Sequence, residues 1–331
     1  MGNGENVRSS ILVIGATGGI GGAVAQAFLQ SGWSVRALNR REPADLNART
    51  DLRGIEWHQG DAMFEEDVVR AARGVDVIFH GANPPMYRRW RELAIPMLAS
   101  SIAAARASGA RLILPGTIYN FGPDAGHLLQ EDAPQNPLTR KGQVRAEMEL
   151  MLQQAAQTGV RSIIVRAGDF FGWQAPSSWF QTLMIKPSAQ VRTIWFPGEH
   201  DIGHCWAYLP DLAQAIYQIV RVEKDLSNFE IYHFGGHWTQ RSVEMAQSIQ
   251  RVCGNPNARI RKLPWPLLRL MAPLVSVFKE MIEMKYLWHV PLRLDNRKLV
   301  SLIGIEPHTP FDEAVKTSLS HLGCLTVREL K

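Results

Sequence analysis

Cysteine is scarce in this sequence. Three of the 331 residues are cysteines, Cys205, Cys253 and Cys324, and their spacing matches neither a disulfide framework nor a metal-binding motif. We therefore expect free thiols, as in proteins of a reducing cytoplasm, and no bound metal. His200 and His204 stand near Cys205 at a spacing that a metal site could use. No further motif supports such a site, so we expect these histidines to be structural.

Blocks of like charge and convincing membrane segments are also missing. The net charge is +5, and the basic residues are scattered, so no nucleic-acid partner is expected. The apolar run from Ile11 to Leu29 contains five glycines and follows no charged leader segment. The run from Leu263 to Trp288 is mixed with cations and is interpreted as a core-facing helix broken near Pro273, rather than a segment lying on a membrane. We expect a cytoplasmic protein without a membrane partner.

The first half of the chain alternates strand-like and helix-like segments. Short apolar runs bounded by Gly or polar residues predict strands at Ile11–Gly15, Ser34–Leu38, Asp76–Ala82, Arg111–Leu114 and Arg161–Val165. Helical patterns lie between them at Ile20–Gln30, Glu65–Ala72, Arg88–Ser108 and Gly142–Gln157. Continuous apolar strands separated by helices predict an α/β fold with a doubly wound parallel sheet covered on both faces.

The pattern changes after Gly172. Residues 174–203 are rich in Trp, Phe and Pro, whereas residues 204–235 return to the alternation, with a predicted helix at Asp211–Val222 and a strand at Phe229–Phe234. From Thr239 the chain is mainly helical by pattern. We therefore predict a nucleotide-binding domain from residues 1–173 and 204–235, and a smaller substrate-binding part from residues 174–203 and 236–331.

A glycine-rich turn follows the first predicted strand. In "ILVIGATGGIGGAVAQAF", Gly15, Gly18 and Gly21 stand between that strand and a helix. Glycines at this point allow a tight turn and a close backbone approach to a pyrophosphate, while the free N–H groups at the helix start bind the anion. We predict a dinucleotide site of the Rossmann type, with Thr17, Gly19 and Ile20 also in contact with the cofactor.

The end of the second predicted strand lacks a carboxylate. An NAD-preferring site uses Asp or Glu there to hold the ribose hydroxyls, but the sequence reads Asn39, Arg40, Arg41. Two guanidinium groups favour a 2′-phosphate. We predict NADP as the cofactor, with NAD as an alternative, and Asn39 and Arg40 as its contacts. The other interpretation is that both arginines are solvated surface residues.

Together these motifs resemble the extended short-chain dehydrogenases/reductases, in the NAD-dependent epimerase/dehydratase group, over nearly the whole chain. The matching segments are the glycine signature at Gly15, Gly18 and Gly21, "QGDAMFEED" with Asp61 and Ala62 near the adenine, "HGAN" with Gly81, Ala82 and Asn83, "LPGTIYNFG", "VRAGDFFG", "YLPDLAQAI" with Asp211, and the ending "LRLDNRKLVSLIGIEPHTPFDEAVKTSL". The resemblance implies a Rossmann fold, a nicotinamide dinucleotide cofactor, and Thr117 in the place of the catalytic serine. By analogy it allows a homodimer.

The sequence departs from this family at its main catalytic motif. The family's Tyr-x-x-x-Lys pair falls in register on Lys141 and Arg145. In the resembling fold this helix start faces the nicotinamide ribose, so Arg145 would hold the ribose, and Lys141 would contact the cofactor and replace the tyrosine as proton donor. Tyr119 is a second candidate donor. The alternative is that Lys141 is solvated and Arg145 is paired with Glu149, which would leave a protein that binds NADP without turnover.

Aromatic side chains cluster where the resembling fold covers its substrate. Trp173, Trp179, Phe180 and Trp206 suggest a largely apolar pocket. A nucleotide-sugar diphosphate usually needs arginines at its pyrophosphate. We therefore predict an NADP-dependent oxidoreductase acting on a small, fairly apolar carbonyl or alcohol. A nucleotide-sugar epimerase or dehydratase, and a non-catalytic NADP(H)-binding sensor, remain as alternatives.

Overall fold

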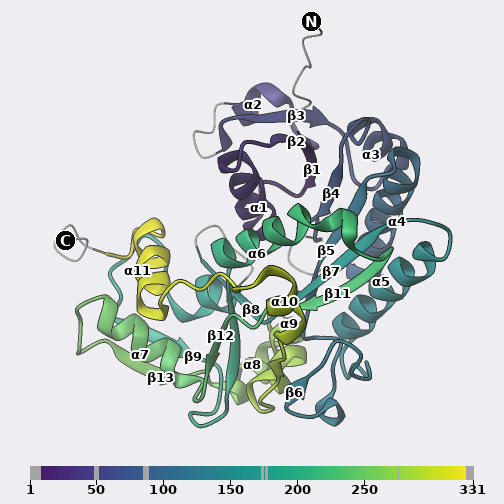
Figure 1. The fold of residues 1–331 in the computed structure, drawn as a ribbon. Coiled ribbons are helices and arrows are strands. Elements are labelled where there is room, and N and C mark those ends of the chain that lie inside the picture. The colour runs from purple at the N-terminus through teal and green to yellow at the C-terminus, as the bar shows by residue number, and fades with distance from the viewer. Residues whose placement is uncertain are drawn as a thin grey trace, which may run out of the picture.

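A seven-stranded parallel sheet forms the centre of the molecule (Figure 1). The computed structural model describes residues 9–47, 52–84, 89–172, 175, 178–274 and 276–325. The sheet consists of β1 (Ser10–Ile14), β2 (Ser34–Asn39), β3 (Ile55–Gln59), β4 (Val77–His80), β5 (Arg111–Thr117), β7 (Ser162–Ala167) and β11 (Phe229–His233). Their order is β11-β7-β5-β4-β1-β2-β3, and every pairing is parallel. The predicted doubly wound α/β fold is confirmed.

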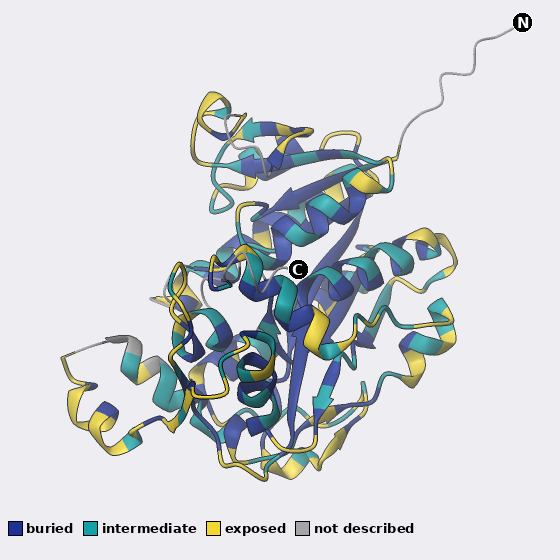
Figure 2. Ribbon diagram, turned by 90° about the vertical axis from the view of Figure 1, so that its left-hand side faces the viewer, coloured by how far each residue is buried: buried dark blue, intermediate teal, exposed yellow. Residues whose placement is uncertain are grey.

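Burial explains why the sheet strands are apolar throughout. Residues of β4, β5 and β7 are buried along their whole length, because helices cover both faces of the sheet. Figure 2 shows these strands in dark blue between the flanking helices. The five strands predicted in the first half are all present, within a few residues at each end.

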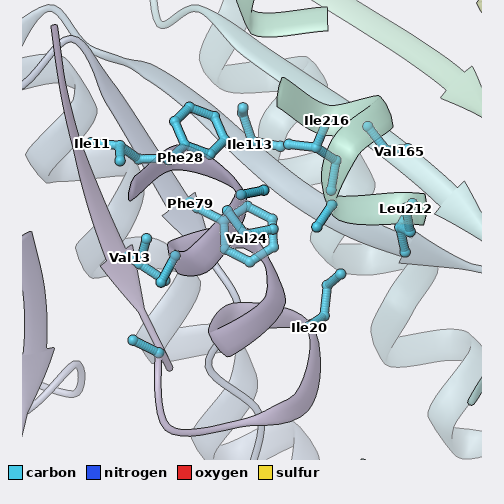
Figure 3. Close-up of a cluster of buried hydrophobic side chains, with 14 of the residues drawn as sticks. Ile11, Val13, Ile20, Val24, Phe28, Phe79, Ile113, Val165, Leu212 and Ile216 are labelled. Atoms are coloured by element: carbon cyan, nitrogen blue, oxygen red, sulfur yellow. The ribbon is translucent and has the colours of Figure 1, made fainter. Parts of the chain in front are cut away.

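Two layers of helices enclose the sheet. α1 (Gly19–Gln30) and α6 (Leu209–Arg221) cover one face, where Val24, Phe28 and Ile216 pack on Val13 and its neighbours (Figure 3). α3 (Glu65–Ala71), α4 (Trp90–Ser108) and α5 (Arg140–Ala156) cover the other face. The short α2 (Pro43–Asn47) follows β2. Each helix contributes one apolar side, as a layered α/β fold requires.

The remaining strands and helices form a smaller assembly below the carboxyl ends of the sheet strands (Figure 1). Its strands form three small sheets: β8 (Asp169–Phe171) with β10 (His204–Tyr208) and β12 (His237–Thr239), β9 (Thr193–Phe196) with β13 (Arg259–Lys262), and β6 (Leu128–Leu129) with β14 (Arg293–Leu294). Its helical segments are η3 (Pro123–Ala125), η4 (Phe180–Met184), α7 (Val243–Val252), α8 (Trp265–Met271), α9 (Ser276–Glu283), η6 (Met284–Trp288) and α11 (Phe311–His321). Two further segments belong to the central layers: η5 (Glu223–Asp225) contacts Arg111 at the start of β5, and α10 (Arg297–Ile303) packs on α6 and β11.

The structure corrects one prediction in this part. The run from Leu263 to Trp288 is broken near Pro273, between α8 and α9, as predicted. However, α8 is not core-facing: it buries Leu268 and leaves Leu267, Leu270 and the following Leu274 exposed. The sequence pattern is misleading here because apolar residues occur on both sides of this short helix. Among the described residues, no helix is long and apolar enough to span a bilayer.

Candidate active site

A cavity of about 780 Å³ lies along the carboxyl ends of the sheet strands. It runs from the ends of β2 and β3, past the loop after β1, to the ends of β5 and β7, and segments from α9 and η4 close its far side. The strand order reverses between β1 and β4, which makes this edge the point where open α/β sheets bind ligands. This volume lies within the range of about 300–1,000 Å³ that is usual for ligand and cofactor sites.

The glycine turn is built for close approach. Gly15 has a φ of +93°, and a Cβ added there would lie 2.7 Å from the carbonyl of Gly81 in the neighbouring loop after β4. A Cβ on Gly21 would lie 2.2 Å from the Gly15 oxygen, so α1 can pack on the turn only without a side chain. α1 begins without an acidic residue or a side-chain cap, which leaves its first N–H groups directed at the cavity. These features fit the pyrophosphate of a dinucleotide.

The ends of β2 and β3 carry side chains of opposite charge. Arg40 and Arg41 follow β2, line the cavity and are exposed. The Asn39 side-chain oxygen accepts a hydrogen bond from the Arg41 backbone N–H at 3.0 Å, which fixes the turn. Asp61 follows β3 and accepts from the Met63 backbone N–H at 3.0 Å. This end of the cavity therefore presents two guanidinium groups near β2 and a single carboxylate near β3.

Thr117 and Asn83 occupy the ends of β5 and β4 in the middle of the cavity. The Asn83 side-chain oxygen accepts a hydrogen bond from Trp90 Nε1 at 2.8 Å. Thr117 is buried, donates to Asn120 Oδ1 at 3.3 Å and accepts from the Tyr119 backbone N–H at 3.2 Å. Its hydroxyl group lines the cavity. A rotation of the hydroxyl hydrogen would let Thr117 donate to a bound oxygen atom.

Lys141 and Arg145 both line the cavity from the first turns of α5. The helix is capped by Thr139, whose hydroxyl accepts from the Gly142 N–H at 2.9 Å. Lys141 is buried, with 5% of its surface exposed, so the interpretation of a solvated lysine is not supported. Arg145 Nη1 donates to the Pro115 carbonyl at 3.4 Å, and its guanidinium lies 5.1 Å from the centre of the Trp90 ring.

The carboxylates closest in sequence to these cations are engaged elsewhere. Glu149 is buried and forms a two-point pair with Arg166, with Nη2 to Oε2 at 2.7 Å and Nε to Oε1 at 3.1 Å. Glu147 pairs with Arg91 at 2.8 Å. Glu149 is therefore held by Arg166, and the alternative that pairs it with Arg145 stays a prediction. Lys141 and Arg145 both line the cavity, and the Glu283 carboxylate accepts a hydrogen bond from the Lys141 backbone N–H at 3.1 Å.

His80, at the end of β4, shows the electrostatic effect of this arrangement. Its side chain is fully buried and lines the cavity, with Nδ1 2.7 Å from Ser101 Oγ. Burial, and then the positive charge of Arg145, lower the pKa of His80 to about 3. The imidazole is therefore neutral at physiological pH and adds no charge to the cations already present.

A buried chain of polar groups reaches the cavity at its far end. The Tyr119 hydroxyl donates to Asp169 Oδ1 at 3.1 Å, and His204 Nε2 lies 2.9 Å from Asp169 Oδ2. The His204 ring is stacked on Trp288, with centroids 3.9 Å apart and planes within 6°. Tyr119 and Asp169 line the cavity, while His204 lies behind them. Neither Asp169 nor the pairing of His204 was predicted, because β8 and β10 bring them together across 35 residues of sequence.

The wall around this end is apolar. Its side chains come from α4, β8, the segment 175–183, the start of α6 and the α9–η6 junction. They are Leu93, Met97, Phe170, Ala175, Trp179, Leu183, Leu209, Met281 and Met284. Ser178 and Thr182 are the neutral polar exceptions on this wall. Four basic side chains line the described cavity as a whole, Arg40, Arg41, Lys141 and Arg145, and none comes from these apolar segments.

The structure brings most of the predicted site residues together. Those that line the cavity are Gly15, Thr17, Gly18, Gly19, Ile20, Asn39, Arg40, Asp61, Ala62, Gly81, Ala82, Asn83, Thr117, Tyr119, Lys141, Arg145 and Trp179. Gly21 lies behind the turn, in contact with the Gly15 backbone. Their individual roles stay predictions.

Two of the predicted pocket residues are corrected. Phe180 and Trp206 have no exposed surface and pack with Phe171 and Trp288 in the hydrophobic core behind the cavity wall. Trp179, the residue before Phe180, lines the cavity instead, because opposite sides of a helical turn face different ways. Trp173 lies outside the described residues.

The remaining sequence expectations concern thiols and metals. Cys205, Cys253 and Cys324 are buried and free, and burial raises the pKa of the Cys205 thiol to about 12, so this thiol is inert. Within the described ranges, no cluster of three His, Cys, Asp or Glu side chains is arranged to hold a metal ion.

Curated relatives match parts of the chain at low identity. Ceramide reductase from Caulobacter vibrioides is 32% identical over 116 residues, which are 34% of this chain and 36% of the relative. A 4-hydroxy-2-methyl-3-oxo-4-farnesyl-3,4-dihydroquinoline-1-oxide ketoreductase from Stigmatella aurantiaca is 26% identical over 203 residues, or 56% of this chain and 57% of that protein. The chain thus spans between about a third and three fifths of the length of these relatives.

Solved structures share the fold over almost the whole chain. UDP-glucuronic acid 4-epimerase from Bacillus cereus, in complex with UDP-glucuronic acid and NAD, superimposes with a TM-score of 0.73 at 17% identity and covers 95% of this chain and 98% of its own. The family described as "RmlD substrate binding domain" matches residues 9–267. The chain therefore belongs to this family, within the extended short-chain dehydrogenases/reductases, which comprise NAD(P)-dependent oxidoreductases, epimerases and dehydratases.

Proposed function

We propose that the protein is an NADP-dependent reductase or dehydrogenase whose substrate carries its carbonyl or alcohol group on an apolar body. The observation that supports this most is the apolar wall beside Thr117, Tyr119 and Lys141. Side chains such as Trp179, Met281 and Met284 would bury hydrocarbon, while the polar groups opposite them would hold one oxygen atom. This is the lining expected for a largely apolar ligand with one reactive polar end.

The same wall argues against a nucleotide sugar as substrate. A pyrophosphate is normally held by arginines or lysines, and burying two negative charges against leucine and methionine would be strongly unfavourable. Lys186 and Arg192, which lie between η4 and β9 in the segment that covers the cavity, are not among its lining residues. The epimerase and dehydratase alternative therefore has less support than the reductase.

The names of two relatives agree with an apolar substrate. One is a ceramide reductase and the other a ketoreductase of a farnesyl-bearing quinoline. Both names denote reduction of a molecule with a long hydrocarbon group. We carry over only this shared chemistry, an oxygen-bearing carbon attached to a long apolar chain.

The cofactor preference is proposed from the end of β2. Arg40 and Arg41 line the cavity where Asn39 replaces the carboxylate that would repel a phosphate. A guanidinium group can hold a 2′-phosphate by two parallel hydrogen bonds. Gly15 and the α1 N-terminus would hold the pyrophosphate, Asp61 and Ala62 the adenine, and Arg145 the second ribose. When bound, the cofactor supplies or accepts a hydride.

Lys141 is our first candidate for proton transfer. It is buried, lines the cavity from the first turn of α5, and stands at the register position of the family's tyrosine. In the reductive direction Lys141 would give that proton to the substrate oxygen, while the Thr117 hydroxyl would donate a hydrogen bond to the same atom. In the oxidative direction both transfers run in reverse.

Tyr119 is the second candidate, and the structure supplies its support. Its hydroxyl is oriented by Asp169, which His204 holds in turn. The hydrogen bonds to Asp169 would keep the Tyr119 hydroxyl in a fixed orientation toward the cavity.

The proposal is tested by following the hydride. NADPH deuterated at the transferable position would be incubated with the protein and a detergent-dispersed extract of lipids, and products one deuterium heavier would be identified by mass spectrometry. A parallel incubation would use an extract of water-soluble metabolites. We expect label in a molecule with a long hydrocarbon group.

Other outcomes would redirect the assignment. Label in a water-soluble metabolite would contradict the apolar substrate. A UDP- or dTDP-sugar that binds and is converted without net label transfer would favour the epimerase or dehydratase. Tight NADPH binding with no transfer to either extract would favour the sensor.

A further inference from the structure

α8 presents leucine side chains to solvent. Leu267, Leu270 and Leu274 are 51%, 76% and 87% exposed, and Met271 is 39% exposed. Their spacing of three, four and seven residues puts them along one side of the helix and its following turn. Scattered single leucines on a surface are ordinary, but a stripe of four apolar side chains on one short helix and the turn that follows it indicates contact with another apolar phase.

The surroundings of this stripe are cationic. Between residues 259 and 285 the sequence has six Lys and Arg residues and two glutamates. Arg259, Arg261, Arg269 and Lys279 are exposed, and the Lys285 ammonium lies 5.4 Å from the centre of the Trp265 ring. One of the two glutamates, Glu283, accepts a hydrogen bond from the Lys141 backbone N–H at 3.1 Å. An apolar stripe flanked by cations complements an anionic lipid surface.

The stripe is also connected to the cavity. α8 packs against α9, and the two helices lie together at the lower end of the molecule in Figure 1. Met281 on α9 and Met284 just after it line the apolar wall, and Glu283 contacts the start of α5. The two-helix unit therefore has one side on the cavity and its α8 leucines in solvent. A molecule leaving a bilayer at α8 would be next to the apolar end of the cavity.

We propose that α8 docks the protein on the surface of an anionic phospholipid membrane, with Leu267, Leu270, Met271 and Leu274 inserted among the acyl chains and the neighbouring cations on the headgroups. The contact is interfacial. The proposal of membrane docking rests on the proposed function only for the purpose of docking, which is to deliver an apolar substrate to the cavity. The exposed leucines and the neighbouring cations are present whatever reaction the protein catalyses.

Vesicle binding of the full-length protein tests the proposal. Binding to vesicles of phosphatidylglycerol, and separately of phosphatidylcholine, would be measured by flotation without substrate. We expect binding to phosphatidylglycerol that weakens with salt and is far weaker on phosphatidylcholine. Leu274→Glu should reduce the partition coefficient about tenfold or more, because it replaces an inserted side chain by a charge. Ile305→Glu is the matched control, since Ile305 is 81% exposed on another part of the surface, and it should retain binding within about twofold.

Three results would overturn the proposal: no binding of the wild-type chain to phosphatidylglycerol, equal loss in the two variants, or a concentration-dependent dimer that Leu274→Glu dissociates while vesicles are ignored. The last result would assign the stripe to a second copy of the chain. NADPH affinity, measured without vesicles, should be the same in both variants and shows that they are folded. Failure of vesicle binding would leave hydride transfer to a detergent-dispersed lipid unaffected, so the two proposals fail separately.

Discussion

At the scale of single residues, Lys141 carries the sharpest prediction. Replacement by Met keeps most of the buried aliphatic volume and removes the proton. We expect kcat to fall roughly 10²- to 10⁴-fold, the usual range for a general acid, while NADPH affinity, followed by nucleotide fluorescence, stays within a few fold. The matched control is Arg140→Met, one residue earlier and exposed, which should leave kcat unchanged.

Tyr119→Phe separates the two candidate donors. If Lys141 is the donor, this variant should retain the larger part of its activity, since the ring stays in place and the hydroxyl that donates to Asp169 takes no part in the proton transfer. A Lys141→Met enzyme as active as the wild type, together with an inactive Tyr119→Phe enzyme, would transfer the role to Tyr119.

Arg40→Ala tests the cofactor preference. Loss of a charged hydrogen bond to a phosphate costs about 1.5–3 kcal/mol, so NADPH affinity should fall by roughly one to two orders of magnitude. NADH affinity should change little, because NADH has no 2′-phosphate. Arg73→Ala, another exposed arginine away from the cavity lining, serves as control. Equal affinities of the wild type for NADPH and NADH would contradict the preference itself.

Residues that follow a strand could be placed from sequence, and residues that meet through tertiary pairing could not. Arg40 was locatable because it follows a predicted strand end at one edge of the sheet, whereas Asp61 and Thr117 were placed by the resemblance to family motifs. Asp169 and His204 meet only because β8 pairs with β10. Nothing in the local pattern signals that pairing, since "HCWAY" has no alternation of polar and apolar residues.

At the scale of elements, the turn between β1 and α1 has the strictest requirement. Gly15→Ala adds a methyl group 2.7 Å from the Gly81 carbonyl and forces alanine to a φ of +93°. We expect NADPH binding to be lost and the free energy of unfolding to fall by about 2–5 kcal/mol from strain and overpacking together. Urea denaturation and fluorescence titration would measure both effects.

Gly74→Ala distinguishes the two causes. Gly74 also has positive φ, at +70°, but a Cβ there meets nothing within 4 Å. This variant should lose only the strain contribution, about 1–2 kcal/mol, and should bind NADPH normally. Equal destabilisation of the two variants would show that the close approach to Gly81 is unimportant.

Two elements, β3 and α8, were predicted wrongly because the apolar pattern of the sequence does not show which of their residues are buried. β3 was not predicted because "IEWHQ" has two buried residues and three polar ones, so it does not form a continuous apolar run at the sheet edge. α8 was predicted as core-facing because its composition is apolar, but composition does not specify which side of a helix packs. Both cases concern elements at the boundary of the fold, where one side faces solvent.

At the scale of the whole molecule, the central sheet and the smaller assembly each contain buried histidines that are neutral. His80 and His233 end two strands of the sheet, and His237 lies on β12. Burial is the main cause that lowers the pKa of all three, to about 3 for His80 and His233 and about 4 for His237. Nearby cations add to the effect, Arg145 beside His80 and Arg166 beside His233.

These shifts make the stability of the fold depend on pH. In the unfolded chain each histidine titrates near pH 6.5, so between about pH 6 and pH 4 the unfolded state binds protons that the folded state rejects. The contribution of these histidines to the free energy of unfolding is therefore fully present above pH 6.5. It falls as the pH is lowered, by up to about 1.4 kcal/mol per pH unit for each histidine. Urea denaturation from pH 7 to pH 5 should show this slope. His80→Gln should reduce it by about one histidine's share whatever its effect at pH 7, whereas His127→Gln, at an exposed position, should leave it unchanged. A slope that His80→Gln does not alter would mean that His80 is protonated in the folded protein, and the positive charge of Arg145 would then need a compensating anion in the cavity.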